Sequence, residues 1–81
     1  MNSIADTAVY ADILIFKTSI KNNSNINKLK PFIDKIVKDG RWNFDLEDCD
    51  KIFRVETSRN IGAQLISLFN INGFNCEELE D

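Results

Sequence analysis

The chain of 81 residues contains no histidine, two cysteines, one proline and three glycines. Without histidine, the commonest general base at neutral pH is missing, and no Ser–His or Cys–His nucleophile can be assembled. Two cysteines are too few for a disulfide framework, so we expect a reduced, cytoplasmic setting. The sequence also has no phosphate-binding glycine loop and no convergent pair of acids, and it therefore favours a protein that is not an enzyme and needs no cofactor.

Long apolar runs are also missing. None approaches the roughly 20 residues that span a bilayer. The chain starts with "MNSIADTAVYADILIF", which has no basic residue and whose apolar part continues into a predicted strand. We therefore expect neither a membrane span nor a signal peptide. The composition, 43% hydrophobic and 28% charged, is that of an ordinary globular domain.

The net charge is −3, with most lysines in the first half and the acids gathered in residues 45–50 and 77–81. Clustered Lys and Arg side chains supply most of the affinity of proteins for nucleic acids. Because the chain has no such cluster, we expect no nucleic-acid partner. The acidic tail, residues 76–81, is either a docking handle for a basic partner or a solvated chain end.

Hydrophobic periodicity predicts a strand followed by a helix. Residues 9–17 are rich in β-branched and aromatic side chains, and the run "ILIF" (13–16) is typical of a central strand buried on both faces. Apolar residues at steps of three and four then form the stripe of a helix. This stripe consists of Ile26, Leu29, Phe32, Ile33, Ile36 and Val37.

The ends of this helix are marked by residues that commonly cap helices. Ser24 or Asn25 can cap its start, and Gly40 can end it in the left-handed conformation. Pro31 lies inside the stripe, where a proline removes one backbone hydrogen bond and disturbs the carbonyl group four residues earlier. We therefore expect either a kink or a true start of the helix near Lys30.

Two strands joined by a hairpin follow. Residues 41–46 alternate between apolar and polar side chains, and residues 50–56 form the next strand after a connection, 47–50, that is short enough for a hairpin. The residues expected to face the core are Trp42, Phe44 and Leu46 in the first of these strands, and Phe53 with Val55 or Ile52 in the second.

A second helix is predicted over residues 58–70, capped by Thr57 or Ser58. Its apolar face holds Ile61, Leu65, Leu68 and Phe69. The turn at 70–73 ends this helix, and residues 74–79 form a last short strand.

The element order βαββαβ is that of a ferredoxin-like α+β sandwich. We expect a four-stranded antiparallel sheet with the first strand in its interior and both helices on one face. Residues 9–81 form this single domain, and residues 1–8 are a flexible lead-in. The loop after the first strand, the hairpin and the turn at 70–73 then lie at the same end of the sheet. The helices are expected to pack through Phe32, Ile36, Leu65 and Phe69.

The element order, the polar loop before an Ile/Leu-striped helix and the closing "GF…L" resemble the heavy-metal-associated domains of copper chaperones and metal-transporting ATPases, over residues 13–79. In that family a Met-x-Cys-x-x-Cys segment after the first strand holds Cu(I) or another soft metal through two thiolates. Aligning Ile26 with the first buried residue of the family's first helix places Lys17 at the Met position and Ser19 and Asn22 at the Cys positions. Because a hydroxyl or an amide cannot replace a thiolate, the resemblance implies the fold without its metal site.

The acidic hairpin, Asp45 to Asp50, offers hard oxygen ligands for Ca²⁺ or Mg²⁺. It lacks the central glycine and the closing Glu of an EF-hand, and the alternation of a strand points its carboxylates apart. We interpret it as a solvated hairpin whose charges discourage edge-to-edge pairing.

The two cysteines have separate interpretations. Cys49 lies among anions, which raise a thiol pKa, so we do not expect a reactive thiol. Cys76 is interpreted as a small core residue. A Cu(I) site formed by both is weighed as well, but strands on opposite sides of the central strand are expected to hold them too far apart. Trp42 either anchors a partner or lies with Phe44 on the inner face of the sheet, and the second interpretation is favoured.

The sequence thus predicts a small cytoplasmic protein-interaction module, monomeric or weakly dimeric through the free edge of the sheet. The alternative is a metal-ion-binding protein that uses Cys49 with Cys76, or the acidic hairpin. The candidate interaction surface lies at the loop end of the sheet and comprises Lys17, Ser19, Lys21, Asn22, Asn23, Asp48, Cys49 and Asp50.

Overall fold

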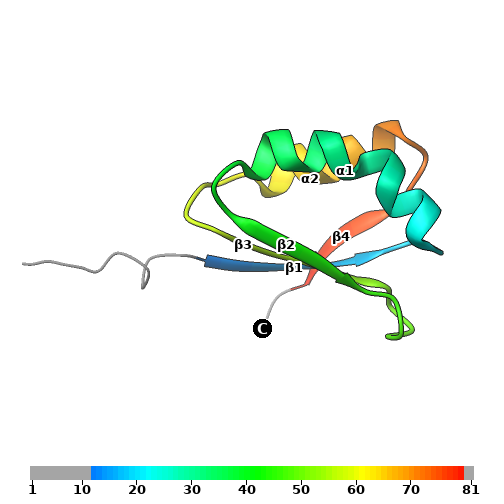
Figure 1. Cartoon of the computed structure of the whole chain (residues 1–81). Coiled ribbons are helices and arrows are strands. Elements are labelled where there is room, and N and C mark those ends of the chain that lie inside the picture. The colour runs from blue at the N-terminus through cyan, green and yellow to red at the C-terminus, as the bar shows by residue number, and fades with distance from the viewer. Residues whose placement is uncertain (1–11, 80–81) are drawn as a thin grey trace, which may run out of the picture.

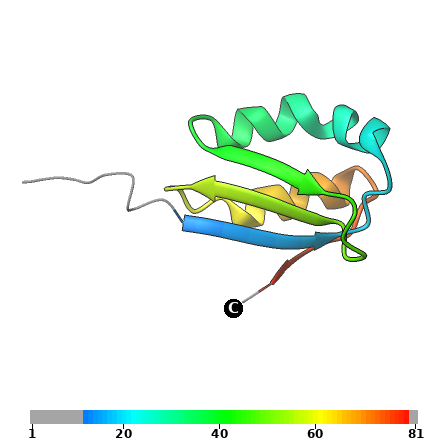
Figure 2. The same ribbon diagram turned by 60° about the horizontal axis from the view of Figure 1, so that its bottom comes forward.

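The computed structural model describes residues 12–79. Its elements are β1 (Asp12–Thr18), α1 (Asn23–Val37), β2 (Arg41–Asp45), β3 (Ile52–Thr57), α2 (Gly62–Ile71) and β4 (Cys76–Leu79). The four strands form one antiparallel sheet in the order β2-β3-β1-β4, and both helices cover the same face (Figures 1 and 2). This is the predicted ferredoxin-like arrangement. The lead-in at 1–8, the start of the first strand at 9–11 and the chain end at 80–81 lie outside the described residues.

Strand β1 is an interior strand, as the run "ILIF" predicts, because it pairs with β3 on one side and β4 on the other. The expectation that it is buried on both faces is wrong. Phe16 is fully buried beneath the helices, but Ile13, on the opposite face, is 51% exposed. The two helices lie on one side of the sheet, and they leave the other side of β1 open (Figure 1).

The core lies between the sheet and the helices and contains an aromatic cluster. The ring of Phe53 stacks on Phe44 at a centroid distance of 4.6 Å, and it also contacts Phe16 at 5.6 Å and Phe69 at 5.2 Å. Phe53 and Val55 face this core and Ile52 faces away, which settles the alternative left open by the sequence. Trp42 and Phe44 lie on the inner face, as predicted, and both are half-buried.

Helix α1 begins earlier and ends differently from the prediction. Asn22, rather than Ser24 or Asn25, is its N-cap, because the Asn22 side-chain oxygen accepts a hydrogen bond from the backbone N–H of Asn25 at 3.0 Å. The helix runs through Pro31, so a start near Lys30 is wrong. Pro31 and the residue four positions before it are both exposed, so water can satisfy the carbonyl group that lacks a donor.

Gly40 does not end the helix in the left-handed conformation. The residue with positive φ at the helix end is Lys38, at 56°. Gly40 is needed for a different reason: a Cβ at this position would collide with the carbonyl oxygen of Glu56 and lie 2.8 Å from Cγ1 of Val37. The absence of a side chain at Gly40 therefore lets the end of α1 approach strand β3 closely.

Helix α2 starts at Gly62, four residues later than predicted, and neither Thr57 nor Ser58 caps it. Thr57 still belongs to β3, where its buried hydroxyl accepts a hydrogen bond from the backbone N–H of Arg59 at 3.1 Å. The helices pack on each other, but Phe32 is 49% exposed and does not belong to the contact as predicted. The buried stripe of α1 follows the steps of four from Leu29 to Val37, and Phe32 lies at its flank.

No helix among residues 12–79 is long and apolar enough to cross a membrane.

Candidate functional site

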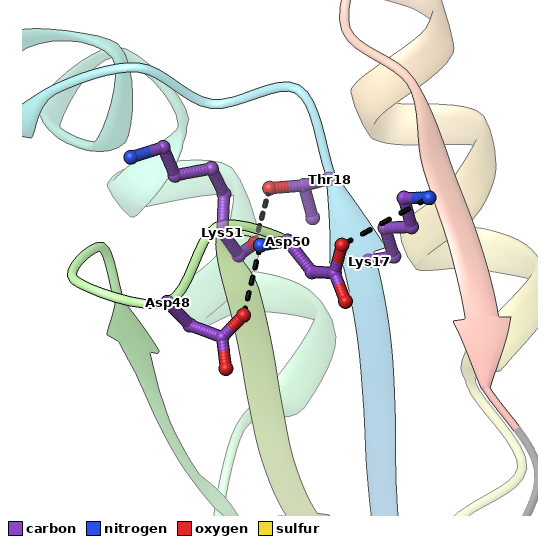
Figure 3. Close-up of polar contacts among 5 residues, drawn as sticks. All are labelled: Lys17, Thr18, Asp48, Asp50 and Lys51. Atoms are coloured by element: carbon purple, nitrogen blue, oxygen red, sulfur yellow. Dashed lines mark hydrogen bonds and ion pairs between the residues drawn. The ribbon is translucent and has the colours of Figure 1, made fainter.

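The loop end of the sheet is built around Thr18, the last residue of β1 (Figure 3). The backbone N–H of Thr18 donates to the carbonyl oxygen of Asp50 at 3.1 Å, and its hydroxyl donates to the carbonyl oxygen of Lys51 at 2.7 Å. The same hydroxyl accepts a hydrogen bond from the backbone N–H of Ile20 at 3.3 Å. Thr18 is only 7% exposed. It therefore fastens the β2–β3 hairpin to the loop that leads into α1.

The turn before β4 joins the same end of the sheet. The backbone N–H of Ser19 donates to the carbonyl oxygen of Asn75 at 3.2 Å, and the Ser19 hydroxyl accepts from the backbone N–H of Asn75 at 2.8 Å. This pair of hydrogen bonds connects residues 56 positions apart in the chain. The prediction that the first loop, the hairpin and the turn before the last strand lie together is confirmed.

The charged side chains of the hairpin bond mainly within the hairpin itself. Oδ1 of Asp48 accepts a hydrogen bond from the backbone N–H of Asp50 at 2.8 Å, and Nζ of Lys51 donates to the carbonyl oxygen of Leu46 at 2.9 Å. Oδ1 of Asp50 lies 3.9 Å from Nζ of Lys17, and both of these side chains are about half exposed. An exposed ion pair at this distance contributes little stability, so the hairpin is held mainly by these side chain–backbone hydrogen bonds and by its bonds to Thr18.

Of the residues predicted to form an interaction surface, those just before and at the start of α1 take part in capping the helix. Asn22 caps α1, and the backbone N–H of Lys21 donates to the side-chain oxygen of Asn25 at 2.9 Å. Lys21, Asn22 and Asn23 are exposed. The side-chain oxygen atoms of both residues at the family's Cys positions, Ser19 and Asn22, are thus engaged with backbone N–H groups.

The residues that can ligate a metal come together at one place in the described part of the chain. Ligand atoms of Asp48, Cys49 and Asp50 lie within 4.8 Å of one another at the exposed tip of the hairpin. Cys76 does not belong to this group. It is buried in β4 opposite Thr18, and burial, with a smaller effect of the negative charge of Glu78, raises the pKa of its thiol to about 12. The thiol of Cys76 therefore stays protonated at neutral pH.

The structure also shows a surface that the sequence analysis missed, the outer face of the sheet. We use this name for the face opposite the helices. Four of its residues are apolar: Ile13 and Ile15 in β1, Ile52 in β3 and Leu79 in β4. Ile15 pairs directly with Leu79, and Ile13 and Leu79 are 51% and 38% exposed. The alternation of "ILIF" within an antiparallel sheet is the signal that could have found it, since every second residue must leave the core.

Charged residues lie beside these apolar side chains. Within residues 12–79, the outer face carries three cationic and three anionic residues: Lys17, Arg41 and Arg54, with Asp45, Glu56 and Glu77. The register places Arg41 opposite Glu56, and Lys17 opposite Glu77. The apolar side chains Ile13, Ile15 and Leu79 thus lie together on β1 and β4, and Arg54 lies beside them in the middle of the outer face.

The chain matches no family model, no curated protein and no solved structure among those compared with it. The resemblance to heavy-metal-associated domains therefore stays a prediction that rests on the residues quoted above.

Proposed function

We propose that the chain is a non-catalytic protein-interaction module on a scaffold that resembles the heavy-metal-associated domains, and that it docks its partner on the outer face of the sheet. The observation that supports this most is the exposure of Ile13 and Leu79 beside half-buried Ile15 and Ile52. Contiguous exposed apolar side chains with a polar rim are typical of protein-binding surfaces.

The charges of the outer face favour a protein as the partner. A polyanion such as a nucleic acid needs a surface on which cationic side chains dominate. Here each of the three cations is balanced by an anion, and two of the cations are paired with anions across neighbouring strands. The complementary partner surface has an apolar part that covers Ile13, Ile15 and Leu79, with charges of both signs beside it.

The outer face suits a partner better than the loop end. At the loop end, Ser19, Asn22 and Asp48 already accept hydrogen bonds from the chain's own backbone. A partner that used these oxygen atoms would have to replace those bonds, with little net gain. On the outer face, a partner removes apolar surface from water, which is favourable in proportion to the area covered.

The test compares what the folded chain captures from native lysate with what its variants capture. Ile13→Lys and Leu79→Lys place a charge among the exposed apolar side chains of β1 and β4 on the outer face, and Ile71→Lys is the matched control, because Ile71 is 82% exposed on α2, away from that face. We expect one protein, identified by mass spectrometry and then purified, to bind the original chain and Ile71→Lys. Its dissociation constant should rise about tenfold or more with Ile13→Lys or Leu79→Lys.

Two outcomes contradict the proposal. If the captured protein binds the outer-face variants as tightly as the original chain, the outer face is not the docking surface. If the folded chain captures no protein that rebinds after purification, the interaction module itself is wrong. Far-UV circular dichroism on each variant ensures that a loss of binding does not reflect unfolding.

The alternative function is metal-ion binding, and the cluster of Asp48, Cys49 and Asp50 is the observation that favours it. Titration with Zn²⁺, Cu(I) and Ca²⁺, followed by the fluorescence of Trp42 and the melting temperature, separates the two functions. We expect no stoichiometric change, because Oδ1 of Asp48 already accepts a backbone hydrogen bond and the cluster at the hairpin tip is largely exposed to water, which competes for the ion. A stoichiometric response that disappears in Cys49→Ala would favour metal binding.

A further inference from the structure

Strand β2 forms an edge of the sheet and, within residues 12–79, pairs with β3 alone. Edge strands are commonly protected by proline, bulges, charged side chains or inward-pointing charges, because their free backbone groups can pair with another chain. The two charges of β2, Arg41 and Asp45, have opposite signs, so they do not repel every second strand as the acids alone are expected to do. The residues of β2, "RWNFD", include no proline, and the inward positions are occupied by Trp42 and Phe44. Both aromatic side chains are only half-buried, whereas Phe53 on the neighbouring strand is fully buried. The edge therefore leaves apolar surface for a further strand to cover.

The sequence of β2 is complementary to itself when two copies run antiparallel. With Asn43 opposite Asn43 of the second copy, Arg41 lies opposite Asp45 and Trp42 opposite Phe44, and each of these pairs occurs twice. Opposite charges and aromatic pairs directly across two strands are both stabilising. The alternation is respected as well, since Trp42 and Phe44 point to the helix side in both copies.

We propose that a second copy of this chain pairs with β2 along this edge and extends the sheet from four strands to eight. The symmetry is a two-fold axis perpendicular to the sheet at Asn43, so the contact is closed and stops at the dimer. The proposal does not rest on the outer face as a docking surface, although the dimer would place the two outer faces side by side.

Helix α1 does not oppose this contact. Two charged residues of α1 contact Trp42 of β2: Nζ of Lys30 lies 5.5 Å from the centroid of the indole ring, and Asp34 accepts a hydrogen bond from Nε1 of Trp42. Because one is cationic and the other anionic, these two residues of a second copy add no net charge at this edge.

The other edge of the sheet lacks this complementarity. Strand β4 carries the consecutive acids Glu77 and Glu78. When two copies of β4 pair antiparallel with their helix sides matched, the two-fold axis passes through a residue. If that residue is Glu77 or Glu78, the glutamate lies directly opposite the same glutamate of the second copy. Like charges in this position are destabilising. Self-association through strand edges is therefore directed to β2.

The test is sedimentation equilibrium of the whole chain from about 1 µM to about 1 mM, repeated on charge-swapped variants. We expect a monomer–dimer equilibrium. Asp45→Arg sets guanidinium groups against each other at both ends of the contact, and it should raise the dissociation constant at least tenfold. The double variant Arg41→Asp with Asp45→Arg restores opposite charges and should return the constant to within about threefold of the original. Melting curves confirm that each variant is folded.

Three results would overturn the proposal: a monomer throughout the concentration range, a dimer that Asp45→Arg leaves unchanged, or a double variant no better than the single one. Assemblies that keep growing with concentration would point instead to pairing of β2 with β4, which does not close. Ile13→Lys and Leu79→Lys should leave the dimer intact, so that failure of the outer-face proposal and failure of the dimer are seen separately. A blue shift of Trp42 emission on dimerisation gives a second readout of the same contact.

Discussion

Nε1 of Trp42 donates a hydrogen bond to Oδ1 of Asp34 at 2.8 Å, and this bond links strand β2 to helix α1. Nζ of Lys30, one turn earlier in the helix, lies 5.5 Å from the centroid of the same indole ring. The edge strand is thus held beneath α1 by one tryptophan with a polar and a cationic contact.

Replacing Asp34 by alanine should lower the free energy of unfolding by about 0.5–1.5 kcal/mol, because the indole N–H loses its acceptor. Urea denaturation followed by Trp42 fluorescence measures this free energy of unfolding, since the chain has a single tryptophan. Asp39→Ala is the matched control, with an exposed carboxylate just beyond the helix end. Equal losses for the two variants would mean that the bond to Trp42 contributes nothing.

The neighbours Phe32 and Ile33 should respond very differently to truncation. Ile33 is fully buried, so Ile33→Ala should cost about 2–5 kcal/mol for lost apolar burial and the cavity left behind. Phe32 is 49% exposed, and Phe32→Ala should cost less than half as much. Chemical denaturation of both variants decides the matter. A larger loss of stability with Phe32→Ala than with Ile33→Ala would contradict the burial of Ile33 and the exposure of Phe32.

Gly40→Ala should destabilise the chain by about 1–3 kcal/mol, because the added methyl group meets the backbone of Glu56 and the side chain of Val37. Gly62→Ala is the comparison: there the nearest atom is the flexible Oε1 of Glu78 at 3.1 Å, and alanine favours the helix. Thermal unfolding should show a lower melting temperature for the first variant and little change for the second. If both behave alike, close approach is not what requires glycine at position 40.

Thr18→Val keeps the shape of the side chain but removes the hydroxyl that bonds Lys51 and Ile20. The free energy of unfolding should fall by about 1–3 kcal/mol, since the buried N–H of Ile20 and the partly buried carbonyl of Lys51 lose their partner. Thr18→Ser retains the hydroxyl and should be less destabilising. Hydrogen exchange of the Ile20 amide, measured by NMR, should accelerate in the valine variant and not in the serine variant. Unchanged exchange in both would contradict the bonded role of Thr18.

Ionisation of Cys76 should weaken folding at alkaline pH. Burial raises the pKa of its thiol from 9.0 to about 12 in the folded chain, so the unfolded chain loses this proton first. The contribution to stability is complete below about pH 9 and is lost progressively toward pH 12. The difference in free energy of unfolding between the original chain and Cys76→Ala should therefore shrink as the pH rises from about 8 to about 10.5. A difference that stays constant over this range would contradict the raised pKa, and Cys49→Ala provides the exposed control.

The element order and the interior position of β1 could be predicted because hydrophobic period and strand propensity report directly on which residues leave water. The exact ends of α1 could not. Asn22, Ser24 and Asn25 can all cap a helix, and the choice depends on the loop anchored by Thr18 and Ser19. Gly40 shows the same limit, because the sequence shows that a glycine is present but not whether a turn or a close neighbour requires it.

Of the two candidate sites, the loop end of the sheet could be predicted from the sequence more directly than the outer face. The meeting of the loop, the hairpin and the turn at one end of the sheet follows from topology alone, and the structure confirms it. The outer face does not follow from the unbroken apolar run "ILIF" taken alone, because such a run is also typical of a strand covered on both sides. It follows when the alternation of a strand is combined with the prediction of both helices on one face, which leaves Ile13 and Ile15 without cover from a helix.

The hydrogen bonds of Ser19 and Asn22 make the order of the first loop independent of any supplied ligand. A loop built around a bound ion is held in place only while the ion is present. Here the backbone N–H groups of Asn75 and Asn25 find their acceptors within the chain itself. Cysteines at both positions would remove these two acceptors. The order of the first loop in such a variant would then depend on bound metal, and therefore on the metal concentration.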